Sequence, residues 1–250
     1  MSTPHMLGTL AATAFFCLAL LRGSRRHPPE KVGHRTLVSI AGGAAAAYVF
    51  MDLMPEVQAA ASAFWIAASH LQMRVLHLAV YLATLAGFLV FYGVEELVIR
   101  SKSEEERRRR REAGVSHPLF RIHVVAFSAY AWMVGYLLVR SLEHTAVQLA
   151  FYAIAMTLHF LAVAHALREE HGPLYDRIGA WVLATSCAAG WACGLAVGFP
   201  VPVIGILLGG VAGGVIANTV ISELPREKQG KFVPFLGGAV IYTGLLIVAE

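Results

Sequence analysis

Almost all of the basic residues of this chain lie in four short clusters, and long apolar stretches separate and flank these clusters. Eighteen of the 20 Lys and Arg residues fall in segments 22–35, 100–121, 168–177 and 226–231. The cytoplasmic loops of membrane proteins are enriched in Lys and Arg. All four clusters can lie on one face only if an even number of membrane spans separates each cluster from the next. The pattern therefore predicts a polytopic membrane protein and, with it, an orientation.

The composition agrees with this class. Hydrophobic residues make up 57% of the chain and charged residues only 14%, whereas soluble domains carry about 25% charged residues. The net charge is +4, but the basic residues lie in loops beside apolar spans, and no basic face with interleaved aromatic residues indicates nucleic-acid binding. The expected partner is the lipid bilayer, and no nucleic acid is expected.

We expect an all-α bundle of eight transmembrane helices, since about 20 apolar residues suffice to cross a bilayer. The first apolar run is a span rather than a secretory signal, because no basic residue precedes it. With the first residue outside, both termini lie outside the cytoplasm, and the expected location is the bacterial inner (plasma) membrane. The expected spans are 5–22, 36–54, 76–99, 120–140, 145–167, 178–198, 201–223 and 232–249.

Segment 57–70 is apolar, but its roughly 14 residues are too few for an easy crossing. Counting it as a span would place clusters 22–35 and 100–121 on opposite faces. We therefore expect either an extension of the second span or an interfacial helix with Phe64 and Trp65 at headgroup depth.

Glycines recur at every fourth position of the sixth and seventh expected spans. Such small residues let two helices approach closely in lipid, so the pattern predicts helix packing. The same faces allow a homodimer or can be used within the bundle. The glycines are Gly190, Gly194 and Gly198 in the sixth span, and Gly205, Gly209 and Gly213 in the seventh.

The third expected span is similar to the eighth, and the second to the seventh. Segment 85–94 (LAGFLVFYGV) aligns with segment 236–245 (LGGAVIYTGL). Because the members of each pair differ by five positions in the order of spans, an odd number, the two copies would be inverted in the membrane, as in many transporters. The residue pairs are Gly87 with Gly238, Phe91 with Tyr242, Gly93 with Gly244, Gly43 with Gly213, Ala47 with Ala217 and Pro55 with Pro225.

This layout resembles that of the ZIP family of divalent-metal transporters, which have eight spans, outside termini and a three-two-three arrangement. Segment 220–228 (VISELPREK) resembles the family's motif at the end of the seventh span, and segment 51–57 (MDLMPEV) resembles the corresponding Pro-terminated segment. The resemblance implies one transmembrane domain over residues 1–250. Its repeat halves would cover about 5–99 and 178–249, and helices 120–140 and 145–167 would link them.

The chain departs from the family at the metal site. Family members carry His-Asn-x-x-Glu-Gly on the fourth span, where this chain has Tyr130, Ala131 and Val134 in the ligand positions. On the fifth span, a His-x-x-Pro-Glu-Gly-like motif corresponds to a run in which His159 is kept, but Ala162 and Val163 replace Pro and Glu. The resemblance therefore implies the family's scaffold with a reduced ligand set.

A polar or ionisable group within the bilayer is costly, so its presence there indicates a function. Five such residues are candidate metal ligands. His159 is near mid-span, and its alternative role is a neutral histidine bonded to a backbone or hydroxyl group. His165 lies toward the inner end of the same span, where it is otherwise a solvated helix end. Asn218 and Glu223 lie near the inner end of the seventh span, and Asp52 lies at the corresponding outer position. The two acids could instead be interfacial.

Three functions stay open. The first is a ZIP-like transporter of a divalent cation, with zinc, iron or manganese as substrate and no other cofactor expected. The second is a transport-inactive membrane scaffold or regulatory protein. The third is a haem- or quinone-binding membrane protein that uses a histidine pair such as His123 and His159. No nucleophile–base pair and no HExxH run is present, so we do not expect an enzyme.

Overall fold

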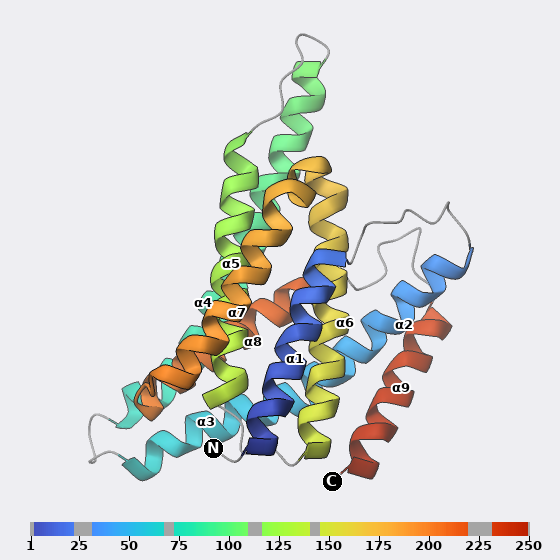
Figure 1. Ribbon diagram of the computed structural model, residues 1–250. Coiled ribbons are helices and arrows are strands. Elements are labelled where there is room, and N and C mark those ends of the chain that lie inside the picture. Colours follow the sequence, from blue (N-terminus) through green and yellow to red (C-terminus); the bar gives the residue numbers. More distant parts are fainter. Residues whose placement is uncertain are drawn as a thin grey trace.

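The computed structural model describes residues 3–22, 32–67, 73–109, 117–140, 146–219 and 232–249, and these ranges contain helices and no strand. The molecule is an elongated bundle with both termini at its lower end in Figure 1. The α-helices are α1 (Thr3–Arg22), α2 (Val32–Tyr48), α3 (Met54–Ala67), α4 (Met73–Arg109), α5 (His117–Arg140), α6 (Ala146–His171), α7 (Ala180–Ala196), α8 (Val201–Asn218) and α9 (Phe232–Ala249), and two π-helical segments are η1 (Val49–Leu53) and η2 (Tyr175–Gly179).

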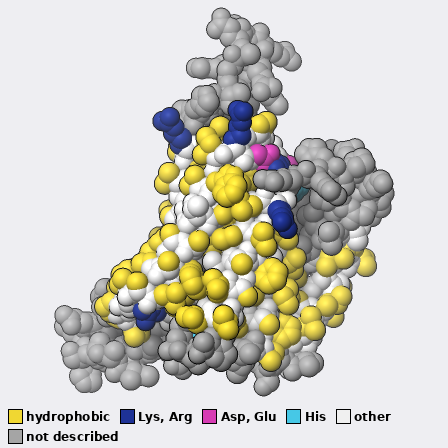
Figure 2. All heavy atoms as spheres, in the orientation of Figure 1, with side chains coloured by type: hydrophobic (Ala, Val, Ile, Leu, Met, Phe, Trp, Pro, Cys, Tyr) yellow, Lys and Arg dark blue, Asp and Glu magenta, His cyan; other side chains and the backbone are white. Residues whose placement is uncertain are grey.

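Six helices of the described part are long and apolar enough to cross a membrane. They correspond to six of the eight expected spans, and the apolar helix at 232–247 is shorter. The flank of the molecule in Figure 2 is covered by apolar side chains, as expected of a surface that faces lipid. The helical, membrane-type class is thus confirmed. The count of eight spans, the orientation and the type of membrane stay predictions. The six helices cover His5–Arg22, Leu78–Leu97, Leu119–Arg140, Val147–His171, Tyr175–Ala196 and Val201–Asn218.

The doubtful segment 57–70 extends the second expected span, as far as it is described. Helices α2, η1 and α3 follow one another without an intervening loop. Val57 and Ala61 in α3 are buried, and α3 packs against α4 and α8. Burial in the bundle therefore holds this part of α3. Phe64 and Trp65 belong to α3, but their side chains lie outside the described residues.

Three helix pairs pack most closely, namely α4 with α8, α5 with α7, and α2 with α9. Glycines lie at each contact, and for α7 and α8 the glycine spacing predicted such packing. A Cβ on Gly190 of α7 would overlap the backbone of Trp132 in α5, and a Cβ on Gly209 of α8 would overlap that of Val80 in α4. Because glycine has no Cβ, these backbones can approach more closely than any other residue would allow.

The α4–α8 and α2–α9 pairs make matching contacts. A Cβ on Gly213 would overlap the carbonyl oxygen of Thr84, and a Cβ on Gly43 would overlap that of Phe235. Gly43 and Gly213 are 170 residues apart, and Thr84 and Phe235 are 151 residues apart. These are the offsets at which the second span aligns with the seventh and the third with the eighth.

A second contact follows the same two offsets in the opposite direction. Gly87 of α4 lies against the backbone of Gly210 in α8, and Gly238 of α9 lies against that of Ile40 in α2. Gly87 and Gly238 are again 151 residues apart, and Ile40 and Gly210 are 170 residues apart. The two helix pairs therefore pack alike, residue for residue, at both points.

Candidate functional site

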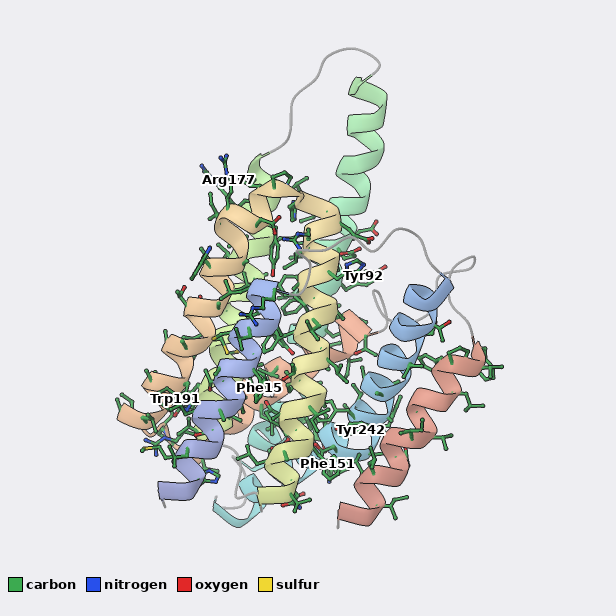
Figure 3. All side chains as sticks on the ribbon, turned by 45° about the vertical axis from the view of Figure 1, so that its right-hand side comes forward. Phe15, Tyr92, Phe151, Arg177, Trp191 and Tyr242 are labelled. Carbon is green, nitrogen blue, oxygen red and sulfur yellow. The ribbon has the colours of Figure 1, made fainter. Side chains whose placement is uncertain are left out.

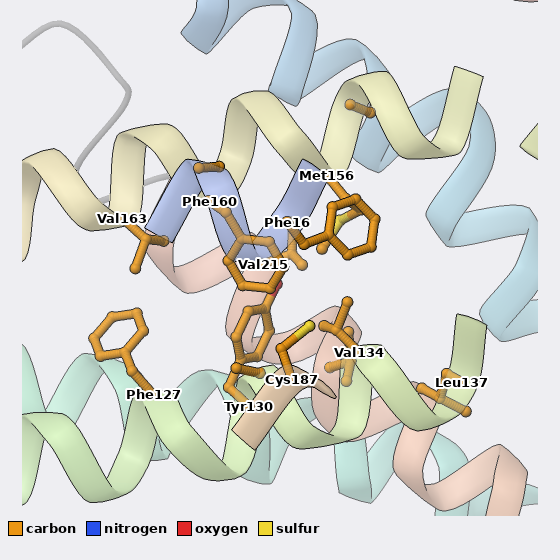
Figure 4. Packing of buried hydrophobic residues seen from close by; sticks show 14 of the residues in the cluster. Phe16, Phe127, Tyr130, Val134, Leu137, Met156, Phe160, Val163, Cys187 and Val215 are labelled. Carbon is orange, nitrogen blue, oxygen red and sulfur yellow. The ribbon is translucent and has the colours of Figure 1, made fainter. Parts of the chain in front are cut away.

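The positions where the ZIP family carries its central ligands are filled by tight apolar packing. Tyr130, Ala131 and Val134 of α5 are buried in the main hydrophobic cluster. The ring of Tyr130 makes edge-to-face contacts with Phe91 of α4 and Phe160 of α6, with centroids 5.5 and 6.0 Å apart. Figure 4 shows Tyr130, Val134 and Phe160 among the other buried side chains of this cluster. Aromatic rings therefore fill the space around these positions.

His159 of α6 is the predicted ligand that lies nearest this centre. Its side chain is only 4% exposed, and its ring lies 5.9 Å from that of Tyr130 and 6.2 Å from that of Phe160. Met156, one turn earlier on the same helix, is also buried. An imidazole beside a thioether can hold a soft or borderline metal ion. The same surroundings equally suit a neutral histidine in an aromatic core.

The other predicted ligands are distributed along the bundle. Asn218 is buried at the end of α8, and Asp52 is half-buried in the π-helical segment η1. His165 is about one-third exposed, and its Nε2 lies 3.4 Å from a carboxylate oxygen of Glu169 on the next turn of α6. Glu223 lies outside the described residues. A ligand set built from these residues stays a prediction.

Among the described residues, the one group of three His, Cys, Asp or Glu side chains close enough to share an ion lies elsewhere. It consists of His123 on α5 with Glu170 and His171 on α6, here called the histidine–glutamate cluster. His123 Nδ1 lies 2.7 Å from His171 Nε2 and 3.1 Å from a carboxylate oxygen of Glu170. His171 Nε2 lies 3.9 Å from the same oxygen. The three side chains are 2%, 11% and 10% exposed.

A glycine at the end of α6 places two members of the cluster. Gly172 has φ +55°, which is the left-handed conformation that ends many helices. Its N–H donates to the carbonyl of Arg168 at 2.8 Å, and its own carbonyl accepts from the N–H of Tyr175 at 3.1 Å. The chain therefore turns directly after Glu170 and His171, and both remain in the last turn of α6.

Two aromatic rings contact the cluster, and an ion pair begins at Arg168, three residues before His171 on α6. The ring of Phe120 lies 5.3 Å from that of His171, and the ring of Phe127 lies 6.0 Å from that of His123. The largely buried Arg168 forms an ion pair with Asp176, which balances its charge nearby. The last carbonyls of α6 carry a partial negative charge, which favours a cation at this end of the helix.

Sequence reasoning paired His123 with His159 in the haem hypothesis, and so missed this cluster. One signal could have found it. The fourth expected span begins, and the fifth ends, on the same membrane face, so His123 and the Glu170–His171 pair are predicted at similar depth. The histidines of the haem hypothesis have separate neighbours, because His123 contacts His171 whereas the ring of His159 contacts Tyr130.

A comparison of the chain with family models, curated proteins and solved structures finds no match. The resemblance to the ZIP family therefore stays a prediction from the sequence.

Proposed function

We propose that this integral membrane protein is a ZIP-like transporter of a divalent cation such as zinc, iron or manganese, built as a three-two-three inverted repeat. The observation that carries the proposal is the residue-for-residue match between the α4–α8 and α2–α9 contacts. Two unrelated helix pairs would not be expected to repeat two backbone contacts at the same sequence offsets. Inverted repeats are a common architecture of secondary transporters, whose substrate path lies between the halves.

The wider helix packing supports the same repeat. Exchanging α1 with α7, α2 with α8, α4 with α9, and α5 with α6 carries one set of packed pairs onto the other. The contact of α1 with α6 then corresponds to the contact of α7 with α5. In the same way, the contact of α5 with α8 corresponds to that of α6 with α2. The contact of α4 with α5 corresponds to that of α9 with α6. In this scheme α5 and α6 form the central pair, and the remaining spans form the two halves.

In the proposed mechanism the two halves alternate in opening the path to either side of the membrane. The central aromatic contacts of Tyr130 would then keep the path closed at mid-membrane. His159 is the predicted ligand beside this closure, so it would contact the ion as the closure opens. An imidazole is a suitable ligand for zinc or iron.

A second candidate function is a ZIP-like scaffold or regulatory protein that does not transport. The packed apolar centre favours it, because Ala131 and Val134 offer no donor atom to an ion. The two functions predict the same fold and differ in flux, so uptake into liposomes separates them.

The experiment is uptake of Zn²⁺, Fe²⁺ and Mn²⁺ into tight proteoliposomes that contain the full-length protein. We expect saturable uptake of at least one ion and its loss in His159→Ala. The matched control is His5→Ala, which removes a histidine at the start of α1, and this variant should keep the uptake. No uptake by well-folded protein would contradict transport and leave the scaffold function. Unchanged uptake in His159→Ala would contradict the role of His159.

A further inference from the structure

We propose that His123, Glu170 and His171 form a binding site for one divalent transition-metal ion at the end of the bundle where α5 begins and α6 ends. This site is separate from His159. Tyr130, which contacts the ring of His159, lies seven residues after His123 on α5, which corresponds to roughly 10 Å along a helix. The inference does not require transport, since an ion can bind here in a transporter or in a scaffold.

The donor atoms define the class of ion. Two imidazole nitrogens and one carboxylate oxygen form a ligand set known from zinc sites, in which water or a substrate takes the fourth position. Imidazole also suits Cu²⁺, Ni²⁺ and Fe²⁺. Mg²⁺ and Ca²⁺ prefer sets made of oxygen ligands, and this cluster supplies a single carboxylate. We therefore expect zinc and its transition-metal neighbours to bind, and magnesium and calcium not to bind.

The spacing of the donor atoms is close to that needed for one tetrahedral ion. With metal–nitrogen bonds of about 2.0–2.1 Å, two ligand atoms lie roughly 3.3 Å apart. The observed separations of 2.7, 3.1 and 3.9 Å bracket this value. The two rings must separate by about 0.6 Å, and the carboxylate must approach His171 by a similar amount. Small side-chain rotations on two separate helices can supply both movements.

The charges around the cluster favour a bound cation. His123 Nδ1 and His171 Nε2 lie within hydrogen-bond distance of each other, at 2.7 Å, so the two ring nitrogens already converge. The positive charge of Arg168 is directed to Asp176. The carboxylate of Glu170 and the carbonyls at the end of α6 add negative charge beside the rings. Burial by Phe120 and Phe127 strengthens these interactions, because water screens them less.

The site can be tested by direct metal binding to the full-length protein in detergent or nanodiscs after treatment with a chelator. Co²⁺ is the probe, since its visible spectrum reports coordination, and Zn²⁺ is then added as a competitor. We expect one Co²⁺ per chain with a tetrahedral spectrum and displacement by Zn²⁺. Mg²⁺ should not displace it. Absence of stoichiometric Co²⁺ binding by folded protein would overturn the proposal, and the three residues would then be a hydrogen-bonded network alone.

Variants assign the ligands. His123→Ala, His171→Ala and the conservative Glu170→Gln should each weaken Co²⁺ binding at least tenfold, because even residues that only orient a ligand cost about 10–100-fold in affinity. The matched controls, His5→Ala and Glu96→Gln, change the same residue types on α1 and α4 and should bind as the unaltered protein does. Equal affinity in all variants would overturn the assignment. If an alanine variant fails to fold, Glu170→Gln still decides, because it keeps the side chain's size.

The outcomes also separate this site from the proposed transport. His159→Ala should retain Co²⁺ binding with an unchanged spectrum, even where it abolishes uptake. Co²⁺ binding without uptake of any ion would support the site and contradict the transporter. Uptake that depends on His159, in a protein that binds no Co²⁺ at His123, would contradict the site and support the transporter.

Discussion

The close contact between α4 and α8 makes Gly213 a position where one methyl group should destabilise the protein. A Cβ there would overlap the carbonyl oxygen of Thr84 and lie 2.6 Å from the backbone nitrogen of Phe88. The Cβ would lie 1.9 Å from the Thr84 oxygen, and since ordinary contact between heavy atoms is about 3.5 Å, the two backbones must separate by roughly 1.6 Å. Neither atom can move by a side-chain rotation alone. Overpacking of this kind costs about 1–3 kcal/mol, and Gly213→Ala should lose this amount of stability.

The measurement is the Tm of the purified full-length protein. It is the temperature at which half of the monodisperse size-exclusion peak is lost on heating. At about 2–4 °C per kcal/mol for a chain of this size, the expected decrease is roughly 2–12 °C. Gly43→Ala should show a similar decrease, because its Cβ would meet Phe235 in the same way. The two values together test the match between the helix pairs as well as the contact.

Gly93→Ala and Gly244→Ala are the matched controls, because they introduce the same change on α4 and α9 where no atom lies within 4 Å of the new Cβ. We expect an unchanged or slightly higher Tm, since alanine is the better helix former by roughly 0.5–1 kcal/mol in water. Equal Tm values for Gly213→Ala and Gly93→Ala would refute the reasoning. A decrease in Gly213→Ala without one in Gly43→Ala would refute the equivalence of the two pairs.

Two further substitutions test single features of the ends of the bundle. Gly172→Ala should cost about 1–2 kcal/mol, because the left-handed backbone disfavours a Cβ although the space around it is open; an unchanged Tm would mean that α6 ends differently. Tyr136→Phe should cost about 1–3 kcal/mol, because the buried hydroxyl donates to the Val197 carbonyl at 3.2 Å and accepts from Phe199 N–H at 2.9 Å. Its Tm, compared with that of Tyr92→Phe at an exposed position, measures this loss.

Loop charge and apolar length were sufficient to predict the helical membrane class and the approximate positions of six spans. The glycine spacing also predicted packing in α7 and α8, and Gly190 and Gly209 lie at such contacts. These features depend on local sequence, because each span must match the bilayer and each close approach needs a residue without a Cβ. In Figure 3, Arg177 lies near the upper end of the helices, whereas Phe15 and Trp191 lie lower, along their apolar length.

The candidate site was less accessible to sequence reasoning, because hydropathy does not state which spans are neighbours. The meeting of His123 with Glu170 depends on α5 and α6 lying side by side at this depth. It also depends on the turn at Gly172, which keeps His171 within the bundle instead of in solvent. The importance of Tyr130 was likewise hidden, since its sequence position indicated a lost ligand and gave no sign of the ring contacts that replace it.

If the two helix pairs are repeats, helix packing and membrane orientation are determined by different parts of this chain. In the proposed repeat, the connection 23–31 between α1 and α2 corresponds to the connection 197–200 between α7 and α8. The first contains Arg25, Arg26 and Lys31, whereas the second contains no Lys or Arg. Loops that are equivalent in the proposed repeat thus differ in charge, and basic residues in short loops favour the cytoplasmic side. In the proposed repeat the glycine contacts of α4 with α8 and of α2 with α9 join the two halves to each other, and the loop charges would insert the halves in opposite senses.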